Sequence, residues 1–181
     1  MTVSPSKLLI LVGLFAVSPI ALAEKGHKAH KGHKAHSHGT AKLNLAVENA
    51  EAISAVIEFE SPADSIYGFE HEAKSQKDKD ALAAGIKKLE DSIGSMIKFD
   101  AKLNCKITTT KMEPAFRDAG EKHSEVRAQF AATCTAPLAG TKVTFGFTSI
   151  FPGISRLEVQ ALSGSKQSSA IVKKDVGAVD L

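Results

Sequence analysis

Several short segments of this chain alternate apolar and polar residues, and this pattern limits the possible folds more than any other feature. Residues 40–47 read TAKLNLAV and residues 53–60 read ISAVIEFE. A period of two is typical of a β-strand that buries one face. The mainly polar residues 48–51 between the two segments predict a hairpin. We expect the second strand to end at Ser61-Pro62, because proline cannot donate a hydrogen bond to the sheet.

Further alternating segments follow, so strands dominate the chain. Their apolar positions are Ala101, Leu103, Cys105 and Ile107; Val126, Ala128, Phe130, Ala132 and Cys134; Val143, Phe145 and Phe147; and Leu157, Val159 and Ala161. After a turn at residues 163–165 we expect residues 170–173 to pair back, and residues 179–181 to add a short edge strand.

One segment has helical spacing instead. Its apolar residues recur at steps of four, three and four, which places them on one face: Leu82, Ile86, Leu89 and Ile93. Ser75 with Asp78 resembles a capping box, so we expect a helix of about 18 residues that begins there and ends near Gly94. The sequence thus predicts an α+β fold, a mostly antiparallel sheet of meanders and hairpins with one amphipathic helix packed on one face. Residues 40–181 suit a single domain.

The first 23 residues have the features of a secretion signal. Lys7 gives a basic start, residues 8–17 form an apolar run, and Ala21-Leu22-Ala23 is an A-x-A cleavage site. The alternative is a membrane anchor, but the apolar run is too short to span a bilayer. We expect export through the Sec pathway, cleavage after Ala23, and no transmembrane anchor in the mature chain.

The chain has two cysteines, Cys105 and Cys134. An even number in an exported protein favours a disulfide. Two thiols can also bind zinc, although no C-x-x-C motif accompanies them here. If the two cysteines are opposite each other in an antiparallel pair, Ile107 faces Ala132 and Thr109 faces Phe130, which keeps the apolar faces in phase. The bridge would close a loop of roughly 30 residues and stabilise the fold by about 3–4 kcal/mol.

Residues 24–39 form a segment rich in Lys, His, Gly and Ala, which we call the histidine tract. We expect it to be disordered without metal, because it has no apolar periodicity. It holds five of the seven histidines of the chain: His27, His30, His33, His36 and His38. Neutral imidazole is a common ligand of transition metals, so the tract predicts Zn²⁺ binding. We expect weak, exchangeable binding, since lysines are interleaved and ordering the tract costs entropy. The alternative is a solvated basic segment with no metal role.

Cu²⁺ and Ni²⁺ stay alternatives to Zn²⁺, because imidazole suits all three ions. Removal of Glu24 after signal cleavage would leave Lys25-Gly26-His27 at the amino terminus. Histidine at the third position is what a square-planar amino-terminal Cu²⁺ or Ni²⁺ site needs.

Two more histidines, His71 and His123, lie in the body of the chain. His71 stands between two glutamates in the loop before the helix, where alternate side chains can point the same way. His123 has a glutamate two residues away on each side. Both are candidate metal ligands, and solvated loop histidines are the alternative.

Other function classes have little support in the sequence. Of the net charge of +3, residues 24–40 supply four Lys and one Glu, so the rest of the chain is close to neutral. Without Trp and with one Tyr, the chain offers no stacking platform for nucleic acid. It has no G-x-S-x-G, Walker, H-E-x-x-H or G-x-G-x-x-G motif. We therefore expect neither a nucleic-acid partner nor an enzyme.

Several elements together resemble those of one family, the ZrgA-like zinc-regulated proteins of Gram-negative bacteria. They are the histidine tract running into residues 39–48, Ser61-Pro62-Ala63, Gly68-Phe69-Glu70-His71, the two cysteines, and Phe151-Pro152. The Gly-Phe-Glu-His element after Ser-Pro-Ala is the most specific of them. The resemblance covers essentially the whole mature chain.

The resemblance implies a periplasmic protein that buffers Zn²⁺ or assists its uptake, beside an ABC importer and its binding protein. In fuller members the loop between the cysteine strands is long and rich in His, Asp and Glu. Here residues 113–123 are short and keep only His123, so we expect the histidine tract to have taken over that role. An envelope module that binds a protein partner and no metal is the alternative.

Overall fold

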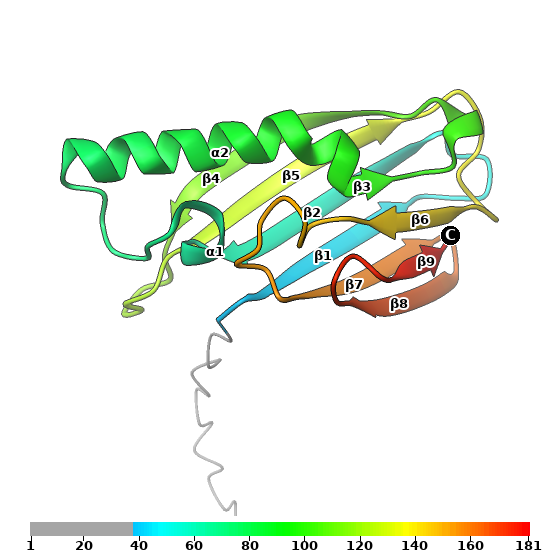
Figure 1. Cartoon of the computed structure of the whole chain (residues 1–181). Helices are drawn as coiled ribbons and strands as arrows, with labels where there is room; N and C mark the ends of the chain where they lie inside the picture. The colour runs from blue at the N-terminus through cyan, green and yellow to red at the C-terminus, as the bar shows by residue number, and fades with distance from the viewer. Residues whose placement is uncertain (1–37) are drawn as a thin grey trace, which may run out of the picture. The chain divides into compact units, whose positions relative to one another are not determined.

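The computed structural model describes residues 38–181, so the predicted signal and the histidine tract before His38 lie outside the described residues. Six strands form the main sheet in the order β4-β5-β2-β1-β7-β8 (Figure 1). Their bounds are β1 Thr40–Val47, β2 Ser54–Pro62, β4 Lys106–Phe116, β5 Glu125–Thr133, β7 Arg156–Ser163 and β8 Lys166–Val172. Neighbouring strands are antiparallel except β1 and β7, which run parallel.

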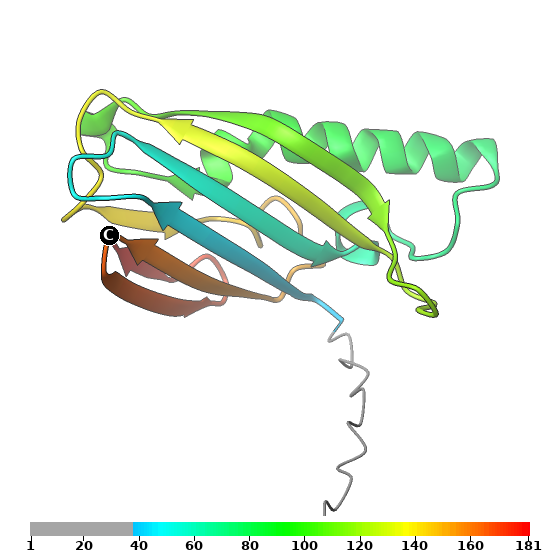
Figure 2. The same cartoon turned by 180° about the vertical axis from the view of Figure 1, so that it is seen from behind.

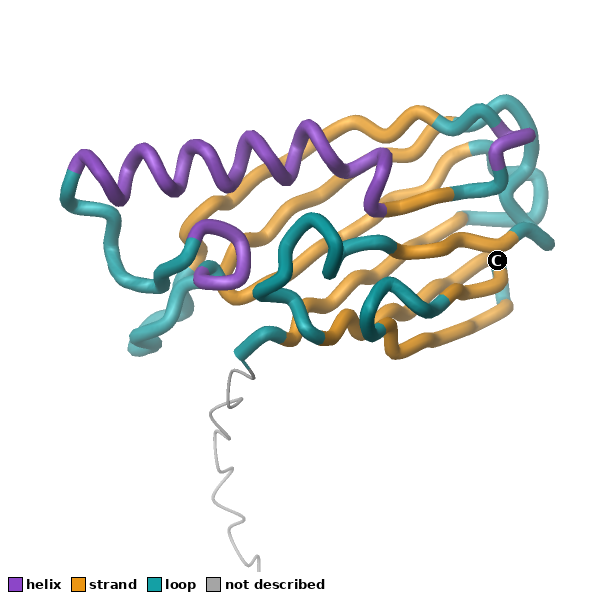
Figure 3. The backbone as a smooth tube through the Cα atoms, viewed as in Figure 1, coloured by secondary structure: helices purple, strands orange, loops and turns teal. Residues whose placement is uncertain are grey.

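The remaining elements lie on one face of the main sheet. They are helix α1 (Asp64–Tyr67), helix α2 (Gln76–Met96), the 3-10 turn η1 (Ala101–Leu103), and a small sheet of β3 (Ile97–Lys98), β6 (Lys142–Phe145) and β9 (Ala178–Asp180). The view from behind shows the opposite face of the main sheet without any covering helix or strand (Figure 2). The architecture is the predicted α+β fold with one long helix on a mostly antiparallel sheet (Figure 3).

The predicted alternation sets which side chains enter the core. Ala41, Leu43, Leu45 and Val47 are all buried, whereas the residues between them are exposed. The same alternation buries Ala55, Ile57 and Phe59 of β2 and Val126, Ala128, Phe130 and Ala132 of β5. Leu89, Ile93 and Met96 of α2 are buried in the same core. No described helix is both long and apolar enough to cross a membrane.

Helix α2 begins as predicted and ends later. The backbone N–H of Asp78 donates to Ser75 Oγ at 3.1 Å, and that of Ser75 donates to Asp78 Oδ2 at 3.3 Å, which completes the capping box. The helix passes the exposed Gly94 and continues to Met96. A single glycine is tolerated near the helix end because the next turn buries Met96 in the core.

Strand β2 ends at Pro62 as predicted, with Ser61 and Pro62 paired with Val126 and Glu125 at its last two positions. Three other local predictions were wrong. Residues 101–103 form η1, where the capping carboxylate of Asp100 favours a turn over a strand. Strand β4 runs on to Phe116, well into the polar segment 113–123. Helix α1, too short to show a period, lies in what was expected to be a loop.

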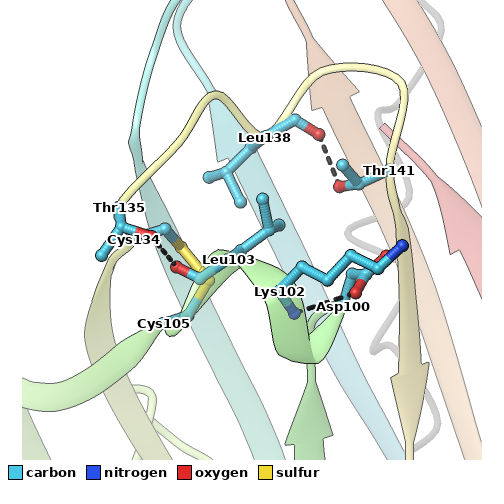
Figure 4. Close-up of a disulfide and its surroundings, with 8 residues drawn as sticks. All are labelled: Asp100, Lys102, Leu103, Cys105, Cys134, Thr135, Leu138 and Thr141. Carbon is cyan, nitrogen blue, oxygen red and sulfur yellow. Dashed lines mark hydrogen bonds between the residues drawn. A yellow bond between two sulfur atoms is a disulfide. The ribbon is translucent and has the colours of Figure 1, made fainter.

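Cys105 and Cys134 form the predicted disulfide. Ile107 pairs with Ala132 and Thr109 with Phe130, which is the predicted register. Next to the bridge, the backbone N–H and the hydroxyl of Thr135 both donate to the carbonyl of Leu103, at 2.8 and 2.9 Å (Figure 4). The bridge and these bonds hold η1 against the end of β5.

Candidate metal centre

Three segments that are far apart in the sequence meet at one end of the main sheet. They are the turn before β1, the loop between α1 and α2, and the loop between β4 and β5. Each contributes one potential metal ligand, His38, Glu70 and His123, and one donor atom from each lies within 4.8 Å of the other two. Among the described residues, this is the one cluster of histidines and carboxylates that could surround an ion.

The backbone next to His38 is fixed by Gly39. Gly39 has a φ of +73°, which a glycine adopts at little cost. Its carbonyl accepts hydrogen bonds from the backbone N–H groups of Ser155 and Arg156, at 2.9 and 3.1 Å. These bonds continue the parallel pairing of β1 with β7, in which Thr40 lies opposite Arg156. His38 is thereby held at the first turn of the folded body.

Glu70 is held through its main chain. Its carbonyl accepts from Arg117 Nη2 at 2.9 Å and from Ser124 Oγ at 2.8 Å. Before it, Phe69 packs edge-on against Tyr67 with ring centroids 4.7 Å apart. These contacts attach the loop after α1 to the loop between β4 and β5, so the carboxylate of Glu70 has a defined position.

His123 precedes Ser124, a residue buried to 1% exposure. The carbonyl of Ser124 accepts from the backbone N–H of Ala63, at 3.0 Å. The loop that carries His123 is therefore bonded both to Glu70 and to the start of α1.

The three side chains lie close enough to share one zinc ion. His38 Nδ1 lies 3.8 Å from Glu70 Oε1, and His123 Nδ1 is in direct contact with Glu70 Oε2. The two imidazole rings meet edge-on with centroids 5.7 Å apart. A tetrahedral zinc ion with bonds of about 2.0–2.1 Å holds its ligand atoms about 3.3 Å apart. Small side-chain movements would therefore place the three groups around one ion.

The carboxylate of the cluster is largely buried, whereas its two imidazoles are exposed. The Glu70 side chain is 11% exposed, that of His123 45% and that of His38 65%. The carboxylate thus forms the floor and the two imidazoles face solvent. Three protein ligands also leave one tetrahedral position for water or an incoming ligand.

A buried tyrosine, Tyr67, packs against Phe69, the residue before Glu70. Burial raises the pKa of Tyr67, a change that Ser124 and Arg117 oppose and the Glu70 carboxylate reinforces. The phenol therefore stays protonated, and it donates to the carbonyl of Pro114 at 3.1 Å. Tyr67 supports the loops of the site and does not compete as an anionic ligand.

The structure brings together two of the predicted ligands and separates a third. His38 and His123 share the cluster. His71 points elsewhere: its Nε2 lies 3.5 Å from Asp78 Oδ2 and its ring stacks on Phe69. His27, His30, His33 and His36 lie outside the described residues.

Sequence reasoning missed two carboxylates. Glu70 was considered only as a carboxylate beside His71 and was not expected to lie with His38 and His123. Asp64, whose Oδ2 lies 3.2 Å from His38 Nδ1, had no signal at all, because its segment was expected to be a loop.

A profile of the ZrgA family of zinc uptake proteins matches residues 35–181, the part of the chain that includes the whole cluster. No curated protein matches the chain. The matched segment exceeds half of the chain and includes the fold, the disulfide and the three converging ligands. The match gives the protein a zinc-related role, and the chain belongs to the ZrgA family of zinc uptake proteins.

Proposed function

We propose that the protein binds Zn²⁺ at a fixed site made by His38, Glu70 and His123. The observation that carries this proposal is the convergence of two imidazoles and a carboxylate from three segments, with donor atoms within 4.8 Å of one another. Two histidines and one carboxylate are a donor set that zinc accepts readily, with a fourth position left open. Membership of a zinc uptake family supports the same ion.

We further propose that the histidine tract supplies weaker, exchangeable ligands beside this site. His38 is both the last histidine of the tract and a ligand of the site, so an ion could pass between the two without leaving the protein. The exposure of both imidazoles supports exchange from the solvent side. On this proposal the protein buffers Zn²⁺ or delivers it.

The proposed setting is the periplasm, after export by the signal in residues 1–23. The proposed recipient is the zinc-binding protein of an ABC importer. We also propose that the protein is not an enzyme, since the chain has no catalytic motif and both cysteines are in the disulfide.

Calorimetric titration with Zn²⁺ tests these proposals with two matched variants. The first changes His27, His30, His33 and His36 to alanine and keeps His38. We expect it to retain one Zn²⁺ per chain and to lose the weaker binding. The second changes Glu70 to glutamine and His123 to alanine and keeps the tract. We expect it to lose the tightest binding event, whereas a His71→Ala control should bind like the wild type.

Other results would point to the alternatives. Full stoichiometry in the second variant and none in the first would leave only the tract as a metal site. Tighter binding of Cu²⁺ or Ni²⁺ than of Zn²⁺ in a competition titration would favour a copper or nickel chaperone. An absence of binding by the wild type would refute a metal role and favour a partner-binding module.

A further inference from the structure

We infer that Asp64 is a positioning residue for the metal site: its carboxylate accepts the hydrogen bond of His38 Nδ1 and so directs His38 Nε2 to the ion. His38 Nδ1 lies 3.2 Å from Asp64 Oδ2, a hydrogen-bond distance. Asp64 is not one of the three residues whose donor atoms converge. The inference rests on the proposed zinc site and adds a residue that acts through one of its ligands.

The reason lies in the chemistry of imidazole. A neutral ring carries one N–H and one lone pair, so an acceptor at one nitrogen fixes which nitrogen can bind metal. Histidine ligands commonly donate their second N–H to a carboxylate, which also orients the ring. The His38 side chain is 65% exposed and has little packing to hold it. Glu70 Oε1, at 3.8 Å from the same nitrogen, is too far for a hydrogen bond.

Asp64 itself is held in place. It opens α1, and its carbonyl accepts from the backbone N–H of Gly68 at 2.9 Å. The hydroxyl of Ser65 lies 3.3 Å from Asp64 Oδ1 and 3.2 Å from the carbonyl of Gly153. The main chain of Asp64 is therefore held by α1, and its carboxylate has one further contact besides His38, with the Ser65 hydroxyl.

The same short segment, residues 153–155, holds both partners of this hydrogen bond. Gly153 bonds to Ser65 on the Asp64 side, and Ser155 bonds to the carbonyl of Gly39 on the His38 side. The side chains of His38 and Asp64 line one open hollow above this segment. The backbone that supports this bond does not include Glu70 or His123, so the bond does not depend on the other two ligands.

Nitrogen-15 NMR with ¹¹³Cd²⁺ as the probe ion tests the inference. The protein would carry His27, His30, His33 and His36 changed to alanine, so that only the body can bind. We expect scalar coupling from ¹¹³Cd to His38 Nε2 and a slowly exchanging proton on His38 Nδ1. Coupling through His38 Nδ1 would overturn the inference. Coupling to no histidine would refute the proposed site itself, so the two failures are distinct.

Affinity measurements on three variants complete the test. We expect Asp64→Ala to weaken Zn²⁺ binding by about 10–100-fold, the range usual for removal of such an outer carboxylate. Asp64→Asn should lose less and keep the Nε2 coupling, because its amide oxygen can still accept from Nδ1. Asp91→Asn, an exposed carboxylate on α2, is the control and should bind like the parent. Unchanged affinity in Asp64→Ala would overturn the inference.

Discussion

At the scale of single residues, Gly39 controls where His38 stands. An added Cβ would lie 2.9 Å from Ser155 Oγ and 3.0 Å from the carbonyl oxygen of Gly153. Its positive φ adds a separate cost of about 1–2 kcal/mol for any L-residue with a side chain. A substitution would therefore move the turn that carries the first ligand of the site.

We predict that Gly39→Ala lowers the free energy of unfolding by about 1–3 kcal/mol and weakens Zn²⁺ binding at the fixed site. Urea unfolding and calorimetry measure the two effects. Gly94→Ala is the matched control, because Gly94 lies on the exposed side of α2 with open space around its Cα. We expect that change to stabilise the protein by about 0.5–1 kcal/mol and to leave the affinity unchanged. Equal effects from the two changes would contradict this account of Gly39.

At the scale of elements, the start of α2 depends on the mutual bonds of Ser75 and Asp78. Hydrogen bonding to Ser75 lowers the pKa of Asp78 below its usual 3.8, and His71 lowers it further. A carboxyl group whose pKa is lower in the folded state stabilises the fold above its unfolded pKa. That contribution is lost as the pH falls through the lower, folded value.

We predict that Asp78→Asn destabilises the protein at pH 7 and that the difference from wild type disappears with acidification below the usual pKa of 3.8. Ser75→Ala should cost about 0.5–2 kcal/mol, because it removes the cap acceptor. Urea midpoints at pH 7, 5 and 3 measure both. A difference that stays constant down to pH 3 would show that the charge of Asp78 does not contribute.

Local sequence patterns predicted the elements that repeat a period and missed those that do not. The apolar pattern extends over enough residues to identify its period in β1, β2, β5 and α2. Helix α1 spans four residues, and the parallel pairing of β1 with β7 leaves no local signal in either strand. The site could be predicted only in part for the same reason. His38 and His123 were candidates one by one, but only the tertiary fold brings them to Glu70.

At the scale of the whole molecule, the β4–β5 hairpin is closed at both ends. The disulfide joins the open end, and the loop with His123 joins the other end to the proposed metal site. Strand β5 spans nine residues, so the two ends are separated by about 30 Å. Interactions at that distance without shared partners act independently as a rule.

We predict that the Cys105→Ala, Cys134→Ala double variant loses about 3–4 kcal/mol of stability and keeps its Zn²⁺ affinity. Zinc at 100 times its dissociation constant should raise the stability of wild type and variant alike, by about 2.7 kcal/mol. Thermal unfolding with and without zinc, beside calorimetry, measures both terms. A tenfold change in affinity on loss of the disulfide would show that the two ends are coupled.

The order of the strands also determines the stage of folding at which the site forms. Strand β1 lies between β2, its neighbour along the chain, and β7, whose Arg156 pairs with Thr40 across most of the sequence. Contacts between such distant residues form late and slow the folding of a domain. A chain that emerges amino terminus first holds β1 long before β7 is available. His38 reaches its position in the site only after β7 has paired with β1. Zinc would therefore bind the fixed site in fully folded molecules and not in incomplete chains.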